Sequence, residues 1–459
     1  MTKITVHPSP SPDGTPPKTG TKTKTRPAHW SNDHGTKFHN PWESYTWPSL
    51  WPLLKTIYLM ATTKDPTRAQ AKTLIPHIPN PDFGASLLND TAHGRAGEGE
   101  GEKKLKATWL GHASVLVEFP TKPTAPPTGG RVGTVGLGEG DEGTGTGEGK
   151  GRRGVRVLFD PVLGEGMAFW GLGPKRDSST PCKIPSLPQI DIIAISHNHY
   201  DHLDLPTLAS VLASQKEQYG AEPVLFMPLN NRHVVAGLGL GSGSGSGGGK
   251  GEGKGEGKKK GEEGGRVVEM DWWEGRRVVV DGVGEVEMTC TPCQHTSSRY
   301  LWDKDNSLWS SWVARDVRPG VVGPTSVFFG GDTGYCFHSP SLHFPSNAPH
   351  LPPPPHLPYC PAFKEIGDRL GPFTLGLIPI GAYFPRMSMS GMHASPGDSV
   401  RIFRDTKCIQ ALGIHWGTFR MTAERLTEPP EMLAAAAREA GLGEGVFGVC
   451  AIGETRGYS

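Results

Sequence analysis

Histidines and aspartates crowd the stretch "SHNHYDHLD", which directly follows the apolar run "IDIIAI". Residues 197–202 have the pattern H-x-H-x-D-H. Buried imidazoles that lie close together repel one another when charged and lose hydration, whereas a cation that takes neutral imidazoles and carboxylates as ligands removes both costs. Alternate residues of an extended loop point the same way, so His197 and His199 would bind one ion, and Asp201 and His202 would face a second position. The pattern therefore predicts a metal site.

Two ligands are too few for each ion, so further ligands are expected where later strands end. His295 closes "TCTPCQH", Asp332 closes "TSVFFGGD", and His415 lies in "QALGIHWG". Each of these residues follows an apolar run and is expected at the same edge of the fold. Imidazoles mixed with carboxylates suit Zn²⁺, with iron as the alternative, although di-iron sites usually have more carboxylates. Two such ions would activate a bridging water for hydrolysis of a phosphodiester.

Four further residues each have a functional and a structural interpretation. Asp160 ends "VLFD", where its carboxylate either contacts a ligand imidazole from behind and so orients it, or makes a turn with Pro161. His112, in "LGHAS", either lines the site or is a hydrogen-bonded turn histidine. Tyr200 lies between ligands and either contacts substrate or packs. His393 precedes a helix start, where it would bind phosphate, protonate the leaving group or serve only in capping.

The elements that must position these residues are short β-branched strands with a few helices between them. Strands are expected at 106–110, 114–119, 155–160, 190–196, 222–228, 266–270, 276–282, 286–291, 325–332, 375–381, 409–417 and 446–453. Helices are expected at 203–215, 395–406 and 429–441, the second with Ser395 as N-cap, Pro396 at N1 and Asp398 at N3. This order predicts an α+β fold, an αββα sandwich in which loops at one edge of two packed sheets share a metal site.

Composition divides the chain into three parts. Residues 1–35, rich in Pro, Thr and Lys, are expected to be disordered. Residues 36–104 form an N-terminal arm, with a membrane-facing segment and a linker. A single domain spans 105–455, with flexible Gly-rich insertions at 129–154 and 237–265.

Charge and cysteine usage limit the partners and the compartment. The net charge of +1 offers no reason for a nucleic-acid partner. The 7 scattered cysteines, without an apolar signal segment before them, predict a reducing intracellular compartment. The expectation is a cytoplasmic protein with peripheral membrane association, with a mitochondrial presequence as the alternative. A homodimer is compatible with the sequence, which does not define the oligomeric state.

The segment "SLWPLLKTIYLM" at 49–60 is unusually apolar for an arm that precedes a domain. It is either a helix packed on the core or an interfacial segment with Trp, Tyr and Lys at the level of lipid headgroups. The second interpretation predicts that this segment docks on a membrane surface. Trp47 and Trp51 would then enter the interface together with the aliphatic residues that follow.

The spaced His and Asp residues resemble those of the metallo-β-lactamase superfamily. Longer strings within 105–420 resemble the N-acyl-phosphatidylethanolamine-hydrolysing phospholipase D family, and "FHNPW" extends the match upstream. These strings are "TWLGHASVLVE", "LFDPVL", "GPKR", "SHNHYDHLD", "DWWE", "FFGGDTGYC", "IPIGAY.PR" and "IHWGTF". The Gly-rich insertions, "QHTSSRY" and "MSMSGMH" depart from the family pattern. The resemblance implies two Zn²⁺ per chain, with the following ligands: His197, His199 and His295 on one ion, Asp201, His202 and His415 on the other, and Asp332 bridging both.

The activity that this resemblance implies is hydrolysis of N-acyl-phosphatidylethanolamine, a phospholipid, to an N-acylethanolamine and phosphatidic acid. The expected catalytic residues are Asp332, Asp201 and His393, and the expected substrate-binding residues are Tyr200, His112 and His393. The alternative is a hydrolase of the same fold that acts on another ester, a lactone, a thioester or a cyclic phosphodiester. A nuclease is disfavoured by the neutral charge. A non-catalytic scaffold is disfavoured because structural zinc is normally closed by four ligands.

Overall fold

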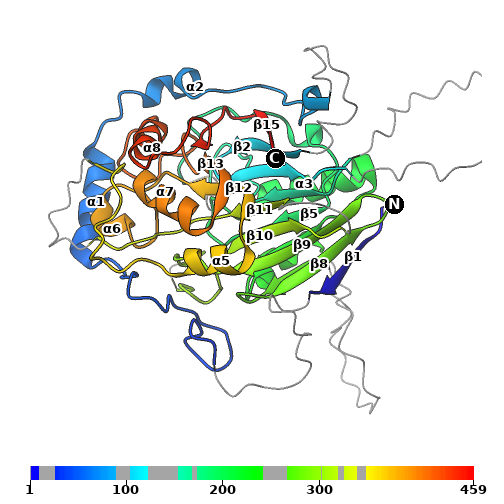
Figure 1. The fold of residues 1–459 in the computed structure, drawn as a ribbon, viewed down its shortest axis with the longest axis horizontal. Coiled ribbons are helices and arrows are strands. Elements are labelled where there is room, and N and C mark those ends of the chain that lie inside the picture. The colour runs from blue at the N-terminus through cyan, green and yellow to red at the C-terminus, as the bar shows by residue number, and fades with distance from the viewer. Residues whose placement is uncertain are drawn as a thin grey trace, which may run out of the picture.

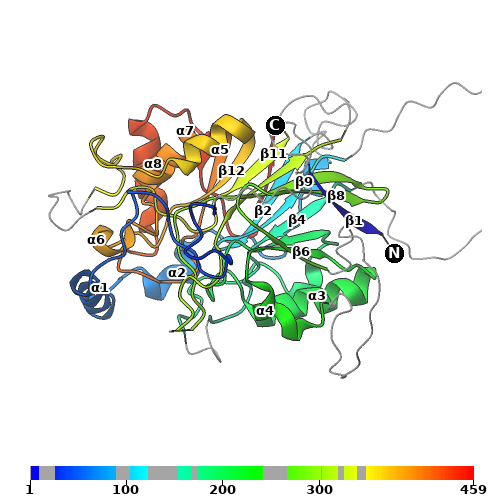
Figure 2. The ribbon, with the colours of Figure 1, turned by 90° about the horizontal axis from the view of Figure 1, so that it is seen from below.

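The computed structural model describes residues 2–9, 26–88, 104–121, 153–167, 173–240, 266–300, 302–318, 325–338 and 348–459. Most of the Gly-rich insertions expected at 129–154 and 237–265 lies outside the described residues. Two β-sheets pack face to face, and helices cover the outer face of each sheet (Figure 1, Figure 2). The predicted αββα sandwich is confirmed.

The two sheets are both mixed. The first has eight strands, in this order: β1 (Ile4–Pro8), β8 (Gly275–Val280), β9 (Gly284–Thr291), β10 (Ser311–Asp316), β11 (Ser326–Phe329), β12 (Phe373–Pro379), β13 (Cys408–Ile414) and β14 (Phe447–Gly448). The second has seven: β15 (Thr455–Tyr458), β2 (Leu105–Gly111), β3 (Ser114–Glu118), β4 (Arg156–Phe159), β5 (Ile192–Ala194), β6 (Val224–Pro228) and β7 (Val267–Met270). Pairing is antiparallel from β1 to β11 and from β15 to β4, and parallel from β11 to β14 and from β4 to β7.

The described residues form short and medium-length α-helices. They are α1 (Leu50–Thr62), α2 (Ala71–Leu74), α3 (Leu205–Tyr219), α4 (Arg232–Val235), α5 (Ala362–Leu370), α6 (Arg386–Met389), α7 (Pro396–Asp405) and α8 (Glu428–Glu439). Figure 2 shows α5, α7 and α8 over the first sheet and α3 with α4 over the second. The capping box predicted for α7 is present, because Ser395 accepts from the Asp398 N–H and Asp398 reaches back to the Ser395 N–H.

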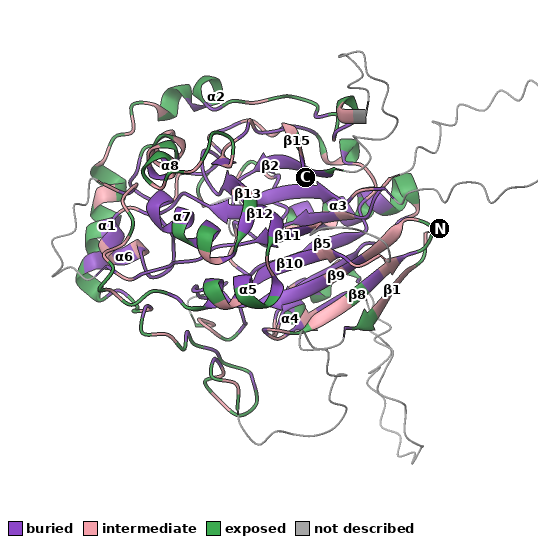
Figure 3. Ribbon diagram, in the orientation of Figure 1, coloured by how far each residue is buried: buried purple, intermediate pink, exposed green. Residues whose placement is uncertain are grey.

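Apolar side chains fill the space between the sheets. Phe159 of β4 stacks on Phe329 of β11 with ring centroids 4.6 Å apart, and Phe226 of β6 meets Trp312 of β10 edge to face at 6.2 Å. All four rings are fully buried. Burial of such a side chain contributes roughly 1.5–3 kcal/mol, so these cross-sheet pairs help to hold the two layers together. Figure 3 shows most strands buried, the edge strands β1 and β8 partly exposed, and the other exposed residues mainly on helices and loops.

The N-terminal region differs from the predicted disorder. Residues Ile4–Pro8 form β1, which pairs antiparallel with β8 at the edge of the first sheet. His29 and Trp30 both contact the carboxylate of Asp271, at 2.7 and 3.0 Å. The expectation of disorder is therefore wrong for these residues, because the short alternating run "ITVHP" pairs with the edge strand despite the polar composition around it. At the other end, β15 continues the second sheet past residue 455.

Candidate metal centre

The predicted ligands meet at one edge of the sandwich because their strands end there. Residues 197–202 follow β5, His295 follows β9, Asp332 follows β11 and His415 follows β13. The strands β9, β11 and β13 run in the same direction within the first sheet, so their carboxyl ends share an edge. The apolar runs that precede these residues therefore place the polar side chains together.

The first group consists of three imidazoles. His199 Nδ1 lies 2.8 Å from His197 Nε2 and 3.2 Å from His295 Nε2. Burial, followed by the neighbouring imidazoles, lowers the pKa of His197 well below its ordinary value. Neutral rings with three converging nitrogens present lone pairs to one point, which fits a zinc ion.

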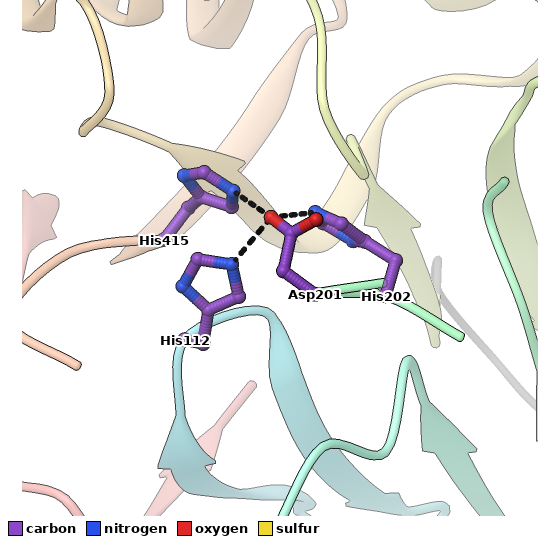
Figure 4. Close-up of side chains that lie close together, drawn as sticks. All are labelled: His112, Asp201, His202 and His415. Carbon is purple, nitrogen blue, oxygen red and sulfur yellow. Dashed lines mark hydrogen bonds and ion pairs between the residues drawn. The ribbon is translucent and has the colours of Figure 1, made fainter. Parts of the chain in front are cut away.

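The second group combines a carboxylate with three imidazoles, as Figure 4 shows. Asp201 Oδ2 lies 3.4 Å from His202 Nε2 and 3.6 Å from His415 Nε2. His112 Nε2 lies 3.0 Å from the same oxygen. Burial opposes ionisation of Asp201, but His202 and the hydrogen bond from His112 hold the pKa of its carboxyl well below the usual range.

Asp332 lies between the two groups. Its Oδ1 is 2.9 Å from His415 Nε2, and its Oδ2 is 3.2 Å from His202 Nε2 and 3.8 Å from His295 Nε2. Burial opposes its ionisation, but His202 and His415 keep the pKa of Asp332 well below its usual value. Two buried carboxylates at one point require positive charge nearby, which a metal ion supplies.

Unsatisfied polar atoms also fit a metal. His202 Nε2, His415 Nε2 and Asp332 Oδ1 are buried and make no aligned hydrogen bond within the described residues. Buried polar atoms almost always have a partner, and each exception requires an explanation. Metal coordination explains all three, because these atoms are the ones that point toward one another.

Outer contacts orient the imidazoles of both groups. His202 Nδ1 lies 2.7 Å from Asp160 Oδ2, and Asp160 also accepts hydrogen bonds from the N–H and hydroxyl of Ser196. His197 Nδ1 is 2.9 Å from Ser196 Oγ, and His295 Nδ1 is 2.9 Å from the Met392 carbonyl. Such partners fix the tautomer and direction of a metal-binding imidazole. The structure thus brings Asp160 against a candidate ligand, the arrangement that the first of its two interpretations from the sequence requires.

The three residues predicted to contact substrate lie in different surroundings. Tyr200 and His199 are half-buried, so the open side of the centre is on this loop. His393 is buried, with Nδ1 3.8 Å from Asp332 Oδ2 and its ring 5.3 Å from that of His295. His112 is buried and directed at Asp201.

Two arginines near the centre were not among the predicted site residues. Arg299 donates to the carbonyls of Asn198 and Leu203 and lies over the Tyr200 ring, 4.2 Å from its centroid. Arg386 donates to the His393 carbonyl at 2.8 Å. Arg386 lies in the string "IPIGAY.PR", but a motif alone does not reveal that its partner is a backbone carbonyl across a turn.

The fold and this buried His/Asp cluster define a metal-dependent hydrolase of the metallo-β-lactamase fold. A family model described as a beta-lactamase superfamily domain matches residues 155–341. This match agrees with the resemblance to the metallo-β-lactamase superfamily.

Two characterised relatives have similar sequences. The N-acyl-phosphatidylethanolamine-hydrolyzing phospholipase D 1 of Caenorhabditis elegans is 28% identical over 406 residues, which cover 87% of this chain and 86% of that protein. The mitochondrial N-acyl-phosphatidylethanolamine-hydrolyzing phospholipase D of Saccharomyces cerevisiae is 29% identical over 291 residues, 63% of this chain and 49% of that protein. Among solved structures, the metallo hydrolase Igni18 of Ignicoccus hospitalis is similar, with a TM-score of 0.40 and 15% identity over 78% of this chain and 99% of that chain.

Proposed function

We propose that this protein hydrolyses the phosphodiester bond of N-acyl-phosphatidylethanolamine, releasing an N-acylethanolamine and leaving phosphatidic acid. Asp332 carries the proposal, because its Oδ1 lies near His415 and its Oδ2 lies near both His202 and His295, so it approaches both groups, as a ligand shared by two metals would. Similarity to the nematode and yeast phospholipases D supports the choice of substrate.

Two Zn²⁺ ions fit the donor set. We infer one ion at His197, His199 and His295, and the other at Asp201, His202 and His415, with Asp332 shared. Bound zinc supplies a Lewis acid for the phosphoryl oxygen and lowers the pKa of a water molecule. The chain's own part is to orient these ligands and to exclude bulk water, which the burial of Asp201 and Asp332 achieves.

His393 and Tyr200 are the proposed contacts to the substrate. His393 lies beside Asp332 on the side of His295, with its Nδ1 3.8 Å from Asp332 Oδ2, so its ring would lie next to a phosphate oxygen of a substrate bound at the centre. Its ring nitrogen would donate a hydrogen bond to that oxygen. Tyr200 faces outward on the ligand loop, with Arg299 against its ring, and would meet the headgroup at the entrance.

A phospholipid does not leave a bilayer readily, since each buried CH₂ contributes about 0.8 kcal/mol, so the protein must reach the membrane. No helix in the described ranges is both long and apolar enough to cross a bilayer. Helix α1 offers a surface that could dock instead. Its exposed residues recur at helical spacing and are large and apolar: Leu50, Trp51, Leu54, Ile57 and Tyr58.

The opposite face of α1 attaches it to the domain. Pro52 and Thr56 are its buried residues, and Thr56 Oγ1 lies 2.5 Å from Ser388 Oγ of α6. The helix α6 leads into the turn that carries His393, so α1 lies next to an element that adjoins the candidate metal centre. Lys55 is exposed on α1 and Lys64 just beyond it, which suits an anionic lipid surface. We infer that this face docks on the membrane.

One assay tests the proposed function. Purified protein is incubated with a panel of phospholipids, with and without a chelator, and products are identified by mass spectrometry. The proposal predicts equal amounts of N-acylethanolamine and phosphatidic acid from N-acyl-phosphatidylethanolamine, lost with chelator and restored by zinc. Turnover of a lactone, a thioester or a cyclic phosphodiester in its place would reject the proposed substrate.

A further inference from the structure

His112 shares the second group of Figure 4 with Asp201, His202 and His415, but it is not among the proposed ligands. Its Nε2 lies 3.0 Å from Asp201 Oδ2, closer than His202 Nε2 at 3.4 Å or His415 Nε2 at 3.6 Å. The His112 side chain is 2% exposed. Contact with a substrate from solvent is therefore not its role.

The backbone of His112 is fixed on both sides. The residue lies in the turn between β2 and β3 with φ +52°, a left-handed conformation that L residues rarely adopt. Its N–H donates to Thr418 Oγ1 at 2.6 Å, and its carbonyl accepts from the His415 N–H at 2.9 Å and from Trp109 Nε1 at 2.8 Å. The turn is thus joined to the segment that carries His415.

The ring of His112 is also confined. Its centroid lies 4.0 Å from that of His415, and the Phe419 ring meets it edge to face at 5.3 Å. Figure 4 shows its second nitrogen turned away from Asp201. This Nδ1 has no hydrogen-bond partner among the described residues. The polar contact that the ring does make is with Asp201.

Around Asp201 Oδ2, the described residues offer no second anchor of this kind. The other atoms near its Oδ2 belong to His202 and His415, which are themselves candidate ligands and would turn their lone pairs to a metal. The contact with His112 Nε2 can persist once a metal is bound. Metal-binding carboxylates are commonly held by such an outer hydrogen bond.

We propose that His112 is a positioning residue whose Nε2–H donates to Asp201 Oδ2 and orients this carboxylate toward the metal ion shared with His202 and His415. The inference rests on the proposed two-metal centre. It assigns the function of His112 to metal binding at one of the two positions and leaves the group of His197, His199 and His295 unaffected.

The test is zinc titration of metal-free protein against a chromophoric chelator, with the visible spectrum of the Co²⁺ form as a second readout. His112→Ala should weaken one of two zinc sites by about 10- to 100-fold, leave the other unchanged and alter the Co²⁺ bands of one site. His112→Gln, which keeps an N–H donor near the Nε2 position, should restore most of the lost affinity.

The matched control is His29→Ala. His29 is also buried and its Nε2 lies 2.7 Å from a carboxylate, Asp271 Oδ1, outside the centre. Melting of each metal-free variant verifies folding, and His29→Ala should keep both zinc sites.

Wild-type affinity at both sites in His112→Ala would overturn the inference while leaving the two-metal centre intact. If His112→Gln binds zinc as weakly as His112→Ala does, the role of His112 as a hydrogen-bond donor would be overturned in favour of direct ligation of the metal. If His29→Ala loses as much zinc affinity as His112→Ala, the loss in His112→Ala would reflect general destabilisation of the fold and not the contact with Asp201. A wild-type protein that binds fewer than two zinc ions would overturn the proposed centre together with this inference.

Discussion

Asp160 Oδ2 lies 2.7 Å from His202 Nδ1, and both side chains are fully buried. Asp160 also accepts a hydrogen bond from the N–H of Ser196, so one carboxylate contacts both the residue before the 197–202 loop and its last histidine. Asp160→Ala should weaken zinc binding at the His202 position by about 10- to 100-fold, because the imidazole loses the partner that fixes its tautomer. The unpaired buried groups should also lower the free energy of unfolding by about 1–3 kcal/mol. Zinc titration and denaturant unfolding measure the two effects.

A matched control for Asp160→Ala is Asp191→Ala. Asp191 is also buried, pairs with Arg153 at 2.6 Å and lies on the same sheet but outside the centre. Asp191→Ala should lower the free energy of unfolding without changing the affinity for zinc. Parallel loss of zinc in both variants would show that Asp160 acts only through the fold.

Helix α1 should bind lipid vesicles through its exposed face. Trp51→Glu with Leu54→Glu should abolish co-sedimentation with anionic vesicles, because charged groups resist entry into the interface. Both side chains are exposed, Trp51 at 70% and Leu54 at 49%, so melting and hydrolysis of a short-chain soluble substrate should stay near wild type.

Ile409→Glu serves as the control for α1, since Ile409 is 45% exposed on β13, away from this helix. It should sediment like wild type. A large drop in the melting temperature of the α1 variant would show that the helix is part of the core, and docking by this face would be rejected.

Asp65 should make the attachment of the arm depend on pH. Its Oδ2 accepts from the Leu426 N–H at 2.8 Å and its Oδ1 from the Thr67 N–H at 2.9 Å. Burial opposes its ionisation, but hydrogen bonds from Thr67 and Leu426 lower the pKa of Asp65 below its ordinary value. A depressed carboxyl pKa stabilises the fold above the unfolded pKa, and the stabilisation is lost as pH falls through the folded pKa.

Asp65→Asn should therefore melt below wild type at pH 7, and the difference should shrink below about pH 4. Asp33→Asn is the control, because the Asp33 side chain is 83% exposed. An Asp65→Asn difference that is equal at pH 7 and pH 3 would contradict this account.

Much of the centre was predictable because the ligands adjoin apolar strands. Residues 197–202 and Asp332 follow continuous apolar runs that indicate buried strands, and the ends of parallel strands meet at one edge. The direction of a side chain in a turn was not predictable from spacing. From the sequence, His112 could line the site or be a hydrogen-bonded turn histidine, and the contact with Asp201 depends on a left-handed backbone that no motif specifies.

The orientation of elements outside the metal centre was equally hard to predict from the sequence. The apolar spacing of α1 indicates a helix but not which face meets the domain, and the structure buries Thr56 while it exposes Trp51. The strand β10 (Ser311–Asp316) and the edge strand β1 were not predicted, because "SWVARD" and "ITVHP" are short and form strands through their neighbours.

Asp332→Ala should abolish turnover of N-acyl-phosphatidylethanolamine, because it removes the carboxylate shared by the two groups. Circular dichroism should show a folded protein, since the surrounding strands keep their apolar packing. Zinc content should fall below that of wild type. Retained turnover in this variant would contradict a shared ligand.

Zinc content measured together with activity tests the central claim most directly. Metal-free protein is titrated with zinc while N-acylethanolamine and phosphatidic acid are quantified by mass spectrometry. The account predicts two zinc ions per chain at full activity and equal amounts of the two products. Full turnover with one zinc ion or none, or zinc-loaded protein that leaves N-acyl-phosphatidylethanolamine intact, would contradict it.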